Sequence, residues 1–424
     1  MIKMTKYKLG DLIDVTRGMS LPGDKYAESG DLIRLTLGNF NIQGNGFKPN
    51  TSKTDLYYTG SVKKEFIMKK GDIITPLTEQ TYGLLGSTAR ILESGKYIQS
   101  QDVALIRSKS DKLYEDFCYY LISSPSVRKQ LGAAAQQTKI RHTSPDKIKD
   151  CEVIIPEDVN QQIKITNFLN TIENKIALNN KTNTELENMA KIIYDYWFTQ
   201  FDFPDKNGHP YKTSGGQMVY NETLKRDIPA GWEVGKLSDI AEIFNGSTPS
   251  TKEDDNYGGN IVWITPKDLS DQQRKFTWYG ERNITEKGYK DCNTTLVPKG
   301  TILLSSRAPI GLVSIAACKL CTNQGFKNIV PRNPVFSNYI YYVIKTNIRK
   351  IEQLGSGTTF KEVSKQSMET FKVIIPPLDI IEKYNIKVCS IFDEQLKLLK
   401  ENDELTKLRD YLLPLLMNGQ IEVK

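Results

Sequence analysis

The chain has 424 residues, which is enough for two or three domains that each bury a core of their own. Charged residues make up 25% and apolar residues 39% of it, and no run of eighteen apolar residues occurs, which excludes a membrane-spanning helix. The net charge of +7 is compatible with nucleic-acid binding, but many proteins without that function carry as much.

Residues 1–156 predict a globular domain built from short strands and helices. Turn-forming residues such as Gly18, Pro22 and Gly30 separate its apolar stretches. We predict strands at residues 32–35, 72–75, 87–91, 103–107 and 151–155, and a helix at residues 113–122.

Residues 157–200 predict one long helix, which we place at about residues 161–197. Its inward-facing residues recur every seven positions in two rows, the spacing of the a and d positions of a coiled coil. The rows are Ile165, Ile172, Asn179, Leu186 and Ile193, and Leu169, Ile176, Asn183, Ala190 and Trp197.

The same two rows return in the C-terminal segment, residues 377–424. They are Tyr384, Ile391, Leu398, Leu405 and Leu412, and Val388, Gln395, Asn402, Arg409 and Leu416. Neither helix can bury its apolar face alone, so we expect the two to pair; two independent interaction helices are the alternative. At ~1.5 Å per residue the pair would form a rod roughly 50–55 Å long.

Residues 201–231 are rich in proline and glycine and predict a linker. Its aromatic residues indicate that it packs against a neighbouring surface and is not a free tether. They are Phe201, Phe203, Tyr211 and Tyr220.

From residue 232 to residue 376 the first domain starts again. The stretch Leu9-Gly-Asp-Leu-Ile13 corresponds to Leu237-Ser-Asp-Ile-Ala241. A glycine expected in a turn follows each of them, Gly18 in the first repeat and Gly246 in the second. Four further pairs follow in the same order, among them Val153-Ile-Ile-Pro156 and Val373-Ile-Ile-Pro376. The chain is a tandem duplication in which each globular domain is followed by a long helix. We therefore predict two mixed α/β (α+β) domains joined by an antiparallel coiled coil of two long helices.

Signals for catalysis are missing. The chain has only two histidines, His142 and His209, and neither a phosphate-binding loop nor a dinucleotide-binding glycine motif. Cys318 and Cys321 form a lone CxxC without further ligands, so we interpret them as core residues and expect no metal site. The scattered cysteines, and an N-terminus without the apolar core of a secretory signal, favour the cytoplasm.

Two short stretches resemble catalytic motifs only weakly. The sequence from Asn333 to Phe336 has the letters of an adenine-gripping loop of amino-methyltransferases with one proline replaced, and we interpret it as a turn before a helix. Asp146, Glu173 and Lys175 have the letters of a nuclease core. We reject that assignment, because Glu173 falls inside the heptad helix and not on a strand.

Polar loops follow the tyrosine-rich helices at matching places in the two repeats. Their glutamine, arginine, lysine and threonine side chains are the kinds that read base edges or hold phosphates, although a solvated loop is the ordinary alternative. We predict DNA contacts by Gln136, Gln137, Lys139, Arg141 and His142 in the first domain, and by Arg307, Ser356, Thr358, Thr359 and Lys361 in the second.

The whole chain resembles the specificity subunits of type I restriction–modification systems. The most specific parts are the helix ends, residues 194–198 and 404–421, and the stretch of residues 228–237. The resemblance implies a subunit without catalysis of its own, in which two target-recognition domains each read one half of a split site in double-stranded DNA.

The resemblance also implies partners. These are two adenine methyltransferase subunits that carry S-adenosylmethionine, and restriction subunits that use ATP and magnesium, whereas this chain holds no cofactor. We predict that seven residues at the helix ends serve the core and the partner interface jointly. They are Tyr194, Trp197, Phe198, Leu412, Leu413, Leu416 and Met417. Pro414 predicts a kink or break in the last helical turn.

Two other classes of function stay open. A self-sufficient methyltransferase or nuclease would need a cofactor motif or a carboxylate pair that the sequence does not offer. A protein-binding scaffold would bind without the steep salt dependence that phosphate contacts impose.

Overall fold

The computed structural model describes residues 2–41, 45–79, 83–134, 141–355 and 361–423. They form two compact units: unit 1 comprises residues 1–178 and 401–424, and unit 2 comprises residues 179–400. The long helices α5 (Val159–Tyr194) and α12 (Leu378–Met417) each contribute one part to each unit.

Unit 1 is a mixed α/β domain whose main sheet has four strands in the order β2-β10-β6-β8. A second sheet has the order β3-β5-β4-β9, and β1 pairs with β12 and β7 with β11. The strands are β1 (Met4–Lys8), β2 (Ile13–Arg17), β3 (Tyr26–Ala27), β4 (Ile33–Arg34), β5 (Tyr57–Tyr58), β6 (Ile73–Pro76), β7 (Thr78–Glu79), β8 (Ala89–Arg90), β9 (Tyr97–Ile98), β10 (Val103–Ser108), β11 (Arg141–His142) and β12 (Glu152–Pro156). The short helices are α1 (Leu9–Leu12), α2 (Phe117–Ile122), α3 (Pro125–Ala134) and α4 (Pro145–Lys149).

Unit 2 repeats this plan around a five-stranded sheet in the order β16-β23-β20-β21-β18. The strands are β13 (Met218–Asn221), β14 (Arg226–Pro229), β15 (Glu233–Lys236), β16 (Ala241–Asn245), β17 (Tyr257–Ile264), β18 (Phe276–Thr277), β19 (Asn283–Ile284), β20 (Ile302–Ser305), β21 (Val313–Ala316), β22 (Cys321–Thr322), β23 (Phe326–Pro331) and β24 (Lys372–Ile375). The short helices are α6 (Leu237–Ile240), α7 (Pro266–Gln272), α8 (Glu286–Asp291), α9 (Ser337–Thr346), α10 (Ile348–Gln353) and α11 (Lys365–Glu369).

Matching details confirm the predicted duplication. The pair β1 and β12 corresponds to β15 and β24, and both pairs are antiparallel. Gly18 and Gly246 have no positive φ; they are required by close packing, because a Cβ would lie 2.2 Å from the carbonyl oxygen of Ser100 and 2.1 Å from that of Asn323. The role predicted for both glycines was a turn, and the structure assigns them a close approach of two backbone segments.

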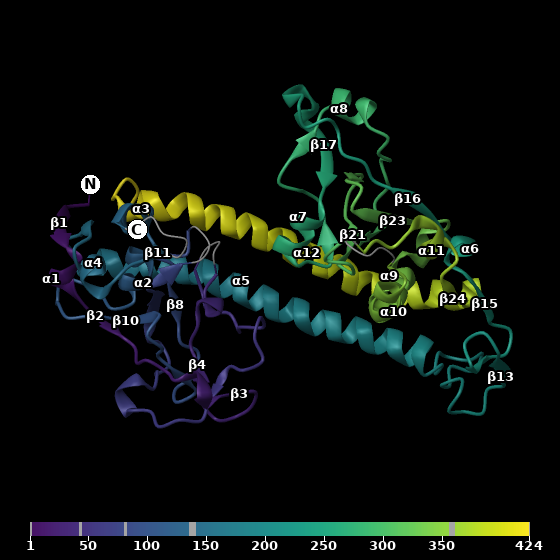
Figure 1. Cartoon of the computed structure of the whole chain (residues 1–424), viewed down its shortest axis with the longest axis horizontal. Helices are drawn as coiled ribbons and strands as arrows, with labels where there is room; N and C mark the ends of the chain where they lie inside the picture. Colours follow the sequence, from purple (N-terminus) through teal and green to yellow (C-terminus); the bar gives the residue numbers. More distant parts are fainter. Residues whose placement is uncertain (1, 42–44, 80–82, 135–140, 356–360, 424) are drawn as a thin grey trace. The chain divides into compact units, whose positions relative to one another are not determined.

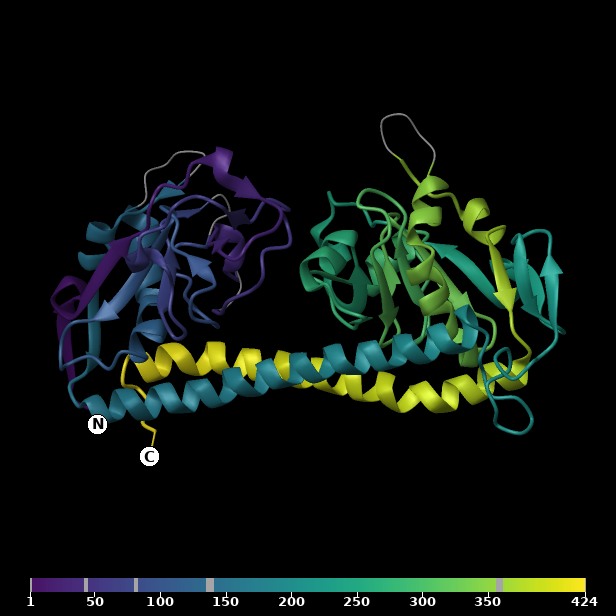
Figure 2. The same ribbon diagram turned by 90° about the horizontal axis from the view of Figure 1, so that it is seen from below.

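In unit 2 the two long helices pack against each other and against the sheet domain (Figures 1 and 2). Gln395 donates a hydrogen bond to Glu187 at 3.2 Å, and the rings of Trp197 and Tyr384 lie 5.9 Å apart. The later residue, Trp197, contacts the earlier residue of α12, Tyr384, and Glu187 contacts the later one, Gln395. The two helices are therefore antiparallel, as predicted.

The same direction holds in unit 1. Arg409 lies 4.0 Å from Glu173, and Lys175 lies 3.4 Å from Glu401. The heptad rows of α12 face inward, and even the polar Gln395 and the charged Arg409 in them are buried. The heptad spacing therefore identified the packed face correctly.

Three details differ from the sequence-based expectation. Helix α5 begins at Val159 and continues as a π-helical turn at Asp195–Thr199. The helix expected at residues 113–122 begins only at Phe117. Helix α12 continues past Pro414 to Met417, so a break there is wrong, whereas the kink given as the other possibility stays a prediction. A proline near a helix end removes one hydrogen bond without ending the helix when the last turn is packed.

The predicted linker is partly ordered. Strands β13 and β14 form an antiparallel hairpin within it. Phe201 and Phe203 are buried in the core of unit 2 together with Trp232, which confirms that the segment is packed, whereas Tyr220 is exposed. In the described residues, no helix is both long enough and apolar enough to cross a membrane.

Candidate nucleic-acid interface

A buried acid–base pair ties two segments of unit 1 together. The short strands β7 and β11 pair so that Glu79 lies opposite Arg141, and their charged groups approach to 2.9 Å. The side chain of Glu79 is only 2% exposed, and its other oxygen accepts hydrogen bonds from the backbone N–H groups of Gly83, Leu84 and Leu85 at 3.1, 2.9 and 3.0 Å. The carboxylate of Glu79 therefore holds the backbone of residues 83–85 as well as the strand that carries Arg141.

Unit 2 has an acid–base pair in the corresponding connection. Arg307 and Glu362 form an antiparallel bridge, and Arg307 Nε lies 3.0 Å from one oxygen of Glu362. The other oxygen lies 3.0 Å from Nζ of Lys327, whose side chain is 5% exposed. Burial acts to raise the pKa of Glu362, but the hydrogen bonds and charges of Lys327 and Arg307 outweigh it and hold that pKa below its usual range.

The two pairs occupy the same place in the duplicated fold, with their charges exchanged. In unit 1, Thr143 donates its backbone N–H to Leu77 just after β6, at 2.8 Å; in unit 2, Val363 donates to Ser306 just after β20, at 2.9 Å. The acid belongs to the first segment in unit 1 and to the second segment in unit 2. What the repeats share is an ion pair at this junction, and not the residues that form it.

Only some of the predicted DNA contacts can be placed. Gln136, Gln137, Lys139, Ser356, Thr358 and Thr359 lie outside the described residues. Arg141 and Arg307 belong to the two acid–base pairs, His142 is exposed on β11, and Lys361 is exposed next to Glu362. The structure thus brings Arg307 and Lys361, which are far apart in the sequence, to one place. Their contact with DNA stays a prediction.

Sequence reasoning missed the two carboxylates. An acidic residue is not expected on a surface that binds phosphates, so residue type alone does not predict a role for Glu79 or Glu362 at the site. The available signal was their position, because Glu79 closely follows a predicted strand and Glu362 lies within one of the matched loops.

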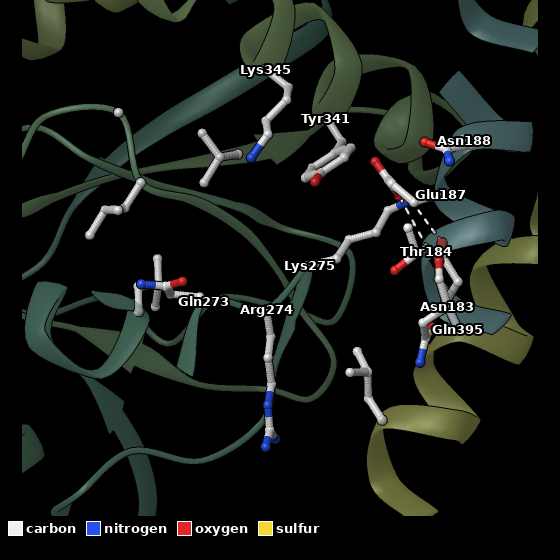
Figure 3. Close-up of a pocket in the computed structure, with 15 residues that line it drawn as sticks. Asn183, Thr184, Glu187, Asn188, Gln273, Arg274, Lys275, Tyr341, Lys345 and Gln395 are labelled. Carbon is white, nitrogen blue, oxygen red and sulfur yellow. Dashed lines mark hydrogen bonds and ion pairs between the residues drawn. The ribbon is translucent and has the colours of Figure 1, made fainter. Parts of the chain in front are cut away.

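A second polar site lies in unit 2, in a cavity of about 480 Å³ among α5, α12 and the sheet domain (Figure 3). Lys275 extends toward Glu187 of α5 and Gln395 of α12, with Nζ 2.7 and 2.9 Å from their oxygens. The same Nζ lies 3.4 Å from the ring centre of Phe392. Burial lowers the pKa of Lys275 to about 8, although Glu187 opposes that shift.

Unit 1 has a counterpart of this site. Arg90 stacks on Tyr119, at 4.1 Å from the ring centre, and donates to Asn170 of α5 at 2.9 Å. Tyr120 also donates to Asn170, at 2.8 Å. In unit 2, Tyr342 of α9 accepts a hydrogen bond from Lys275 at 3.3 Å and donates one to Glu187 of α5 at 3.2 Å. The tyrosine-rich helices α2 and α9 of the two repeats therefore each join a cation to α5. We interpret both sites as the attachment of a sheet domain to the long helices, and not as ligand sites.

The weak catalytic resemblances have structural explanations. Asn333 accepts a hydrogen bond from the backbone of Val335 and caps the turn Pro334–Phe336 before α9, as predicted. Glu173 lies inside α5, which confirms that it is not on a strand. Cys321 is buried in β22 and Cys318 is half-buried. Among the described residues, no three His, Cys, Asp or Glu side chains are grouped so that they could hold a metal ion.

The seven residues predicted at the helix ends are mostly core residues. Tyr194, Trp197 and Phe198 are buried in unit 2, and Leu416 and Met417 are buried in unit 1, with Leu412 and Leu413 packed against that core. Their packing role is confirmed, and their part in a partner interface stays a prediction. The large apolar side chains that α5 exposes are others, Leu178, Met189 and Ile192, and Tyr196 is exposed in the π-helical turn that follows.

Comparison with known proteins places these features in a family. The family profile described as "Type I restriction modification DNA specificity domain" matches residues 1–188 and 229–407. The type I restriction enzyme HindI specificity subunit of Haemophilus influenzae is 25% identical over 413 residues, covering 85% of this chain and 88% of that protein. The MjaIX specificity subunit of Methanocaldococcus jannaschii is 42% identical over 191 residues, which are 45% of this chain and 44% of the relative.

A solved structure supports the fold. The type I restriction-modification system S subunit from M. genitalium matches with a TM-score of 0.59 at 16% identity, covering 98% of this chain and 96% of that one. At this identity the match speaks for the fold alone. The family profile, by contrast, covers most of the chain and falls on both repeats. The chain therefore belongs to the type I restriction–modification DNA specificity family, whose domain it carries twice.

Proposed function

We propose that this chain is the DNA sequence-recognition subunit of a type I restriction–modification complex. Each sheet domain reads one half of a bipartite site in double-stranded DNA. Partner subunits then methylate adenine or cleave the DNA, and this chain contributes no catalytic group of its own.

One observation carries this proposal. The two repeats each have an ion pair at the same junction between two segments, but the acid and the base have changed places. Glu79 with Arg141 and Arg307 with Glu362 hold equivalent segments, while the side chains around them differ. A repeated scaffold with unlike polar residues at one place suits two readers of unlike half-sites, in the way that tandem readers on other folds take successive DNA elements.

The proposal is tested by expressing the chain with its methyltransferase partner and mapping N6-methyladenine across the host genome by single-molecule sequencing. We expect a motif of two short, unlike halves with a fixed unread gap. Replacing residues 1–156 by the corresponding domain of another specificity subunit should change one half only. A contiguous motif would contradict the two-reader proposal, and a folded complex without methylation would favour a protein-binding scaffold.

We further propose that the partners are two methyltransferase subunits, which carry S-adenosylmethionine, and restriction subunits that use ATP and magnesium. Support comes from α5, where Met189 and Ile192 are exposed and three residues apart, so that they lie on one face of the helix. Tyr196 is exposed in the π-helical turn that follows α5. An exposed apolar row on a paired helix is typical of a protein contact.

The partner contact is tested by the substitution Ile192→Asp, with Lys181→Glu on the same helix as control. Both side chains are exposed, so thermal unfolding should not change. We expect Ile192→Asp to abolish co-elution with the methyltransferase subunit in gel filtration and Lys181→Glu to retain it. Equal retention of the partner by the two variants would remove this face from the interface.

A further inference from the structure

A basic depression lies beside the Arg307–Glu362 pair of unit 2. Its volume is about 590 Å³, and its lining residues are Asn245, Gly246, Arg307, Gln324, Lys327, Glu362, Ser364 and Lys365. Three cations and one carboxylate among them leave a net charge of +2. Ser364, Gln324 and Asn245 add polar groups that can donate hydrogen bonds.

The cations of this depression divide into a buried one and two exposed ones. The side chain of Lys327 is almost fully buried, and Glu362 compensates its charge at 3.0 Å. Arg307 and Lys365 are 48% and 45% exposed at their side chains, and Lys365 lies 3.5 Å from Glu369. The carboxylate of Glu362 therefore holds both the buried lysine and Nε of Arg307. One carboxylate does not neutralise three cations, so the exposed Lys365 and the half-exposed Arg307 can still meet an anion from solvent.

A second basic depression, of about 490 Å³, lies beside the Glu79–Arg141 pair of unit 1. It is lined by Glu79, Gly83, Leu85, Arg128, Lys129, Gly132, Ala133 and Arg141. Three cations and one carboxylate again leave a net charge of +2. Arg128 is held by the carbonyl oxygens of Ser123 and Gly83, at 3.1 and 3.3 Å, whereas Lys129 is exposed.

The two depressions share the ion pair at the matched junction but little else. In unit 1 the other cations come from α3, and in unit 2 they come from β23 and from the first residue of α11. Different elements thus supply the same net charge beside the same junction. Because the internal repeat preserves the charge and not the residues, the common feature is electrostatic, and a net positive charge suits a phosphate group. Only the depression of unit 2 adds amide and hydroxyl side chains.

We propose that each depression binds a phosphate of the DNA backbone, with Lys129 in unit 1 and Arg307 and Lys365 in unit 2 as the contacting residues. The inference rests on the proposed function. It assigns these residues to affinity and register, because phosphate contacts carry no sequence information directly. Glu79 and Glu362 are positioning residues that hold the cations and do not touch DNA.

The test measures binding of the full-length chain to a random-sequence DNA duplex over a range of salt concentrations. Lys365→Gln and Lys129→Gln change exposed side chains, so thermal unfolding is expected to match that of the unchanged chain. Each lost phosphate contact should reduce the slope of log K against log salt by about 0.9. The genomic methylation motif should stay the same in both variants.

Matched controls are Lys70→Gln in unit 1 and Lys290→Gln in unit 2, which are exposed lysines that line neither depression. If the depression variants keep the same salt slope as these controls, the phosphate assignment is overturned. Titration with inorganic phosphate distinguishes a free anion from DNA: phosphate binding lost in Lys365→Gln, with no change in the DNA salt slope, would also overturn it.

Failure of the proposed function has a different signature. The unchanged chain would then bind the duplex without a steep salt dependence, or direct no bipartite methylation. Suppose instead that the unchanged chain directs a bipartite motif, while Lys365→Gln and Lys129→Gln have the same slope of log K against log salt as the control variants. That result would refute the phosphate sites and leave the proposed function intact.

Discussion

Nζ of Lys275 lies 2.7 Å from Oε2 of Glu187, and this contact joins the sheet domain of unit 2 to helix α5. Lys275 is 7% exposed at its side chain, so it depends on protein groups to replace its water shell. Gln395 of α12 supplies a second acceptor and Phe392 an aromatic face. One cation therefore connects three elements that are far apart in the sequence.

Loss of the Glu187 charge should weaken unit 2. In Glu187→Gln the buried Lys275 keeps only neutral acceptors, and breaking a buried pair in this way costs about 3 kcal/mol of unfolding free energy. Glu185→Gln is the control, because Glu185 is exposed and lies 4.0 Å from Lys181; we expect it to change stability by less than about 0.5 kcal/mol. Urea unfolding compares the two. Equal midpoints would show that the Lys275–Glu187 contact contributes nothing.

The stability of unit 2 should rise with pH above about 8 because of Lys275. Its pKa falls from 10.5 to about 8 on folding, so between these values the unfolded chain binds more protons than the folded one. Stability therefore increases as pH rises through about 8, by at most about 1.4 kcal/mol per pH unit. The measurement is the difference in unfolding free energy between the unchanged chain and Lys275→Met at pH 7.5 and pH 9. Parallel pH profiles would contradict this assignment, since all other titrating groups are common to both.

Glu79→Gln should destabilise the chain more than Glu362→Gln. Glu79 is almost fully buried and its carboxylate serves three backbone N–H groups as well as Arg141, whereas the side chain of Glu362 is 35% exposed. We expect a loss of about 3 kcal/mol for Glu79→Gln and of about 1 kcal/mol for Glu362→Gln. Chemical denaturation followed by circular dichroism gives both values. The reverse order would mean that burial does not govern these two sites.

Gly18→Ala and Gly246→Ala should each be severely destabilising. The added methyl group would lie within 2.2 Å of a carbonyl oxygen in both cases, and backbone cannot move aside as a flexible side chain can. We expect a loss of about 3 kcal/mol or more from such overpacking. Gly23→Ala is the matched control, because its nearest neighbour would be a ring atom of Tyr26 at 3.9 Å. A melting temperature unchanged in Gly18→Ala would show that the two segments can separate at little cost.

The sequence-based predictions were correct for long periodic segments and failed for short elements. The heptad rows extend over five repeats, so a single polar residue such as Gln395 or Arg409 did not hide the packed face. The start of α2 was misjudged because the apolar Leu113 precedes the helix in an irregular segment, where local pattern does not distinguish helix from loop. The hairpin β13–β14 was missed because its strands have only four residues each.

The candidate site was only partly predictable. The matched loops and Arg307 were found from residue type and from their place in the repeat. Lys327 was not found, because it lies outside the matched loops, and a lysine in a short strand is ordinarily expected to point to solvent. Glu79 and Glu362 were not found, because their role depends on a partner that strand pairing brings from a distant segment.

The sequence by itself determined the duplication, the two long helices and their inward faces, because periodicity and repetition are properties of neighbouring residues in the chain. Only the tertiary structure decided that Arg141 meets Glu79, that Arg307 meets Glu362 and that Lys275 meets Glu187. These pairs join residues that are distant in sequence, and the register of strand pairing and the packing of α5 against the sheet domain select them. A charged side chain has many possible partners in a sequence, and only the packing of the fold decides which of them it meets.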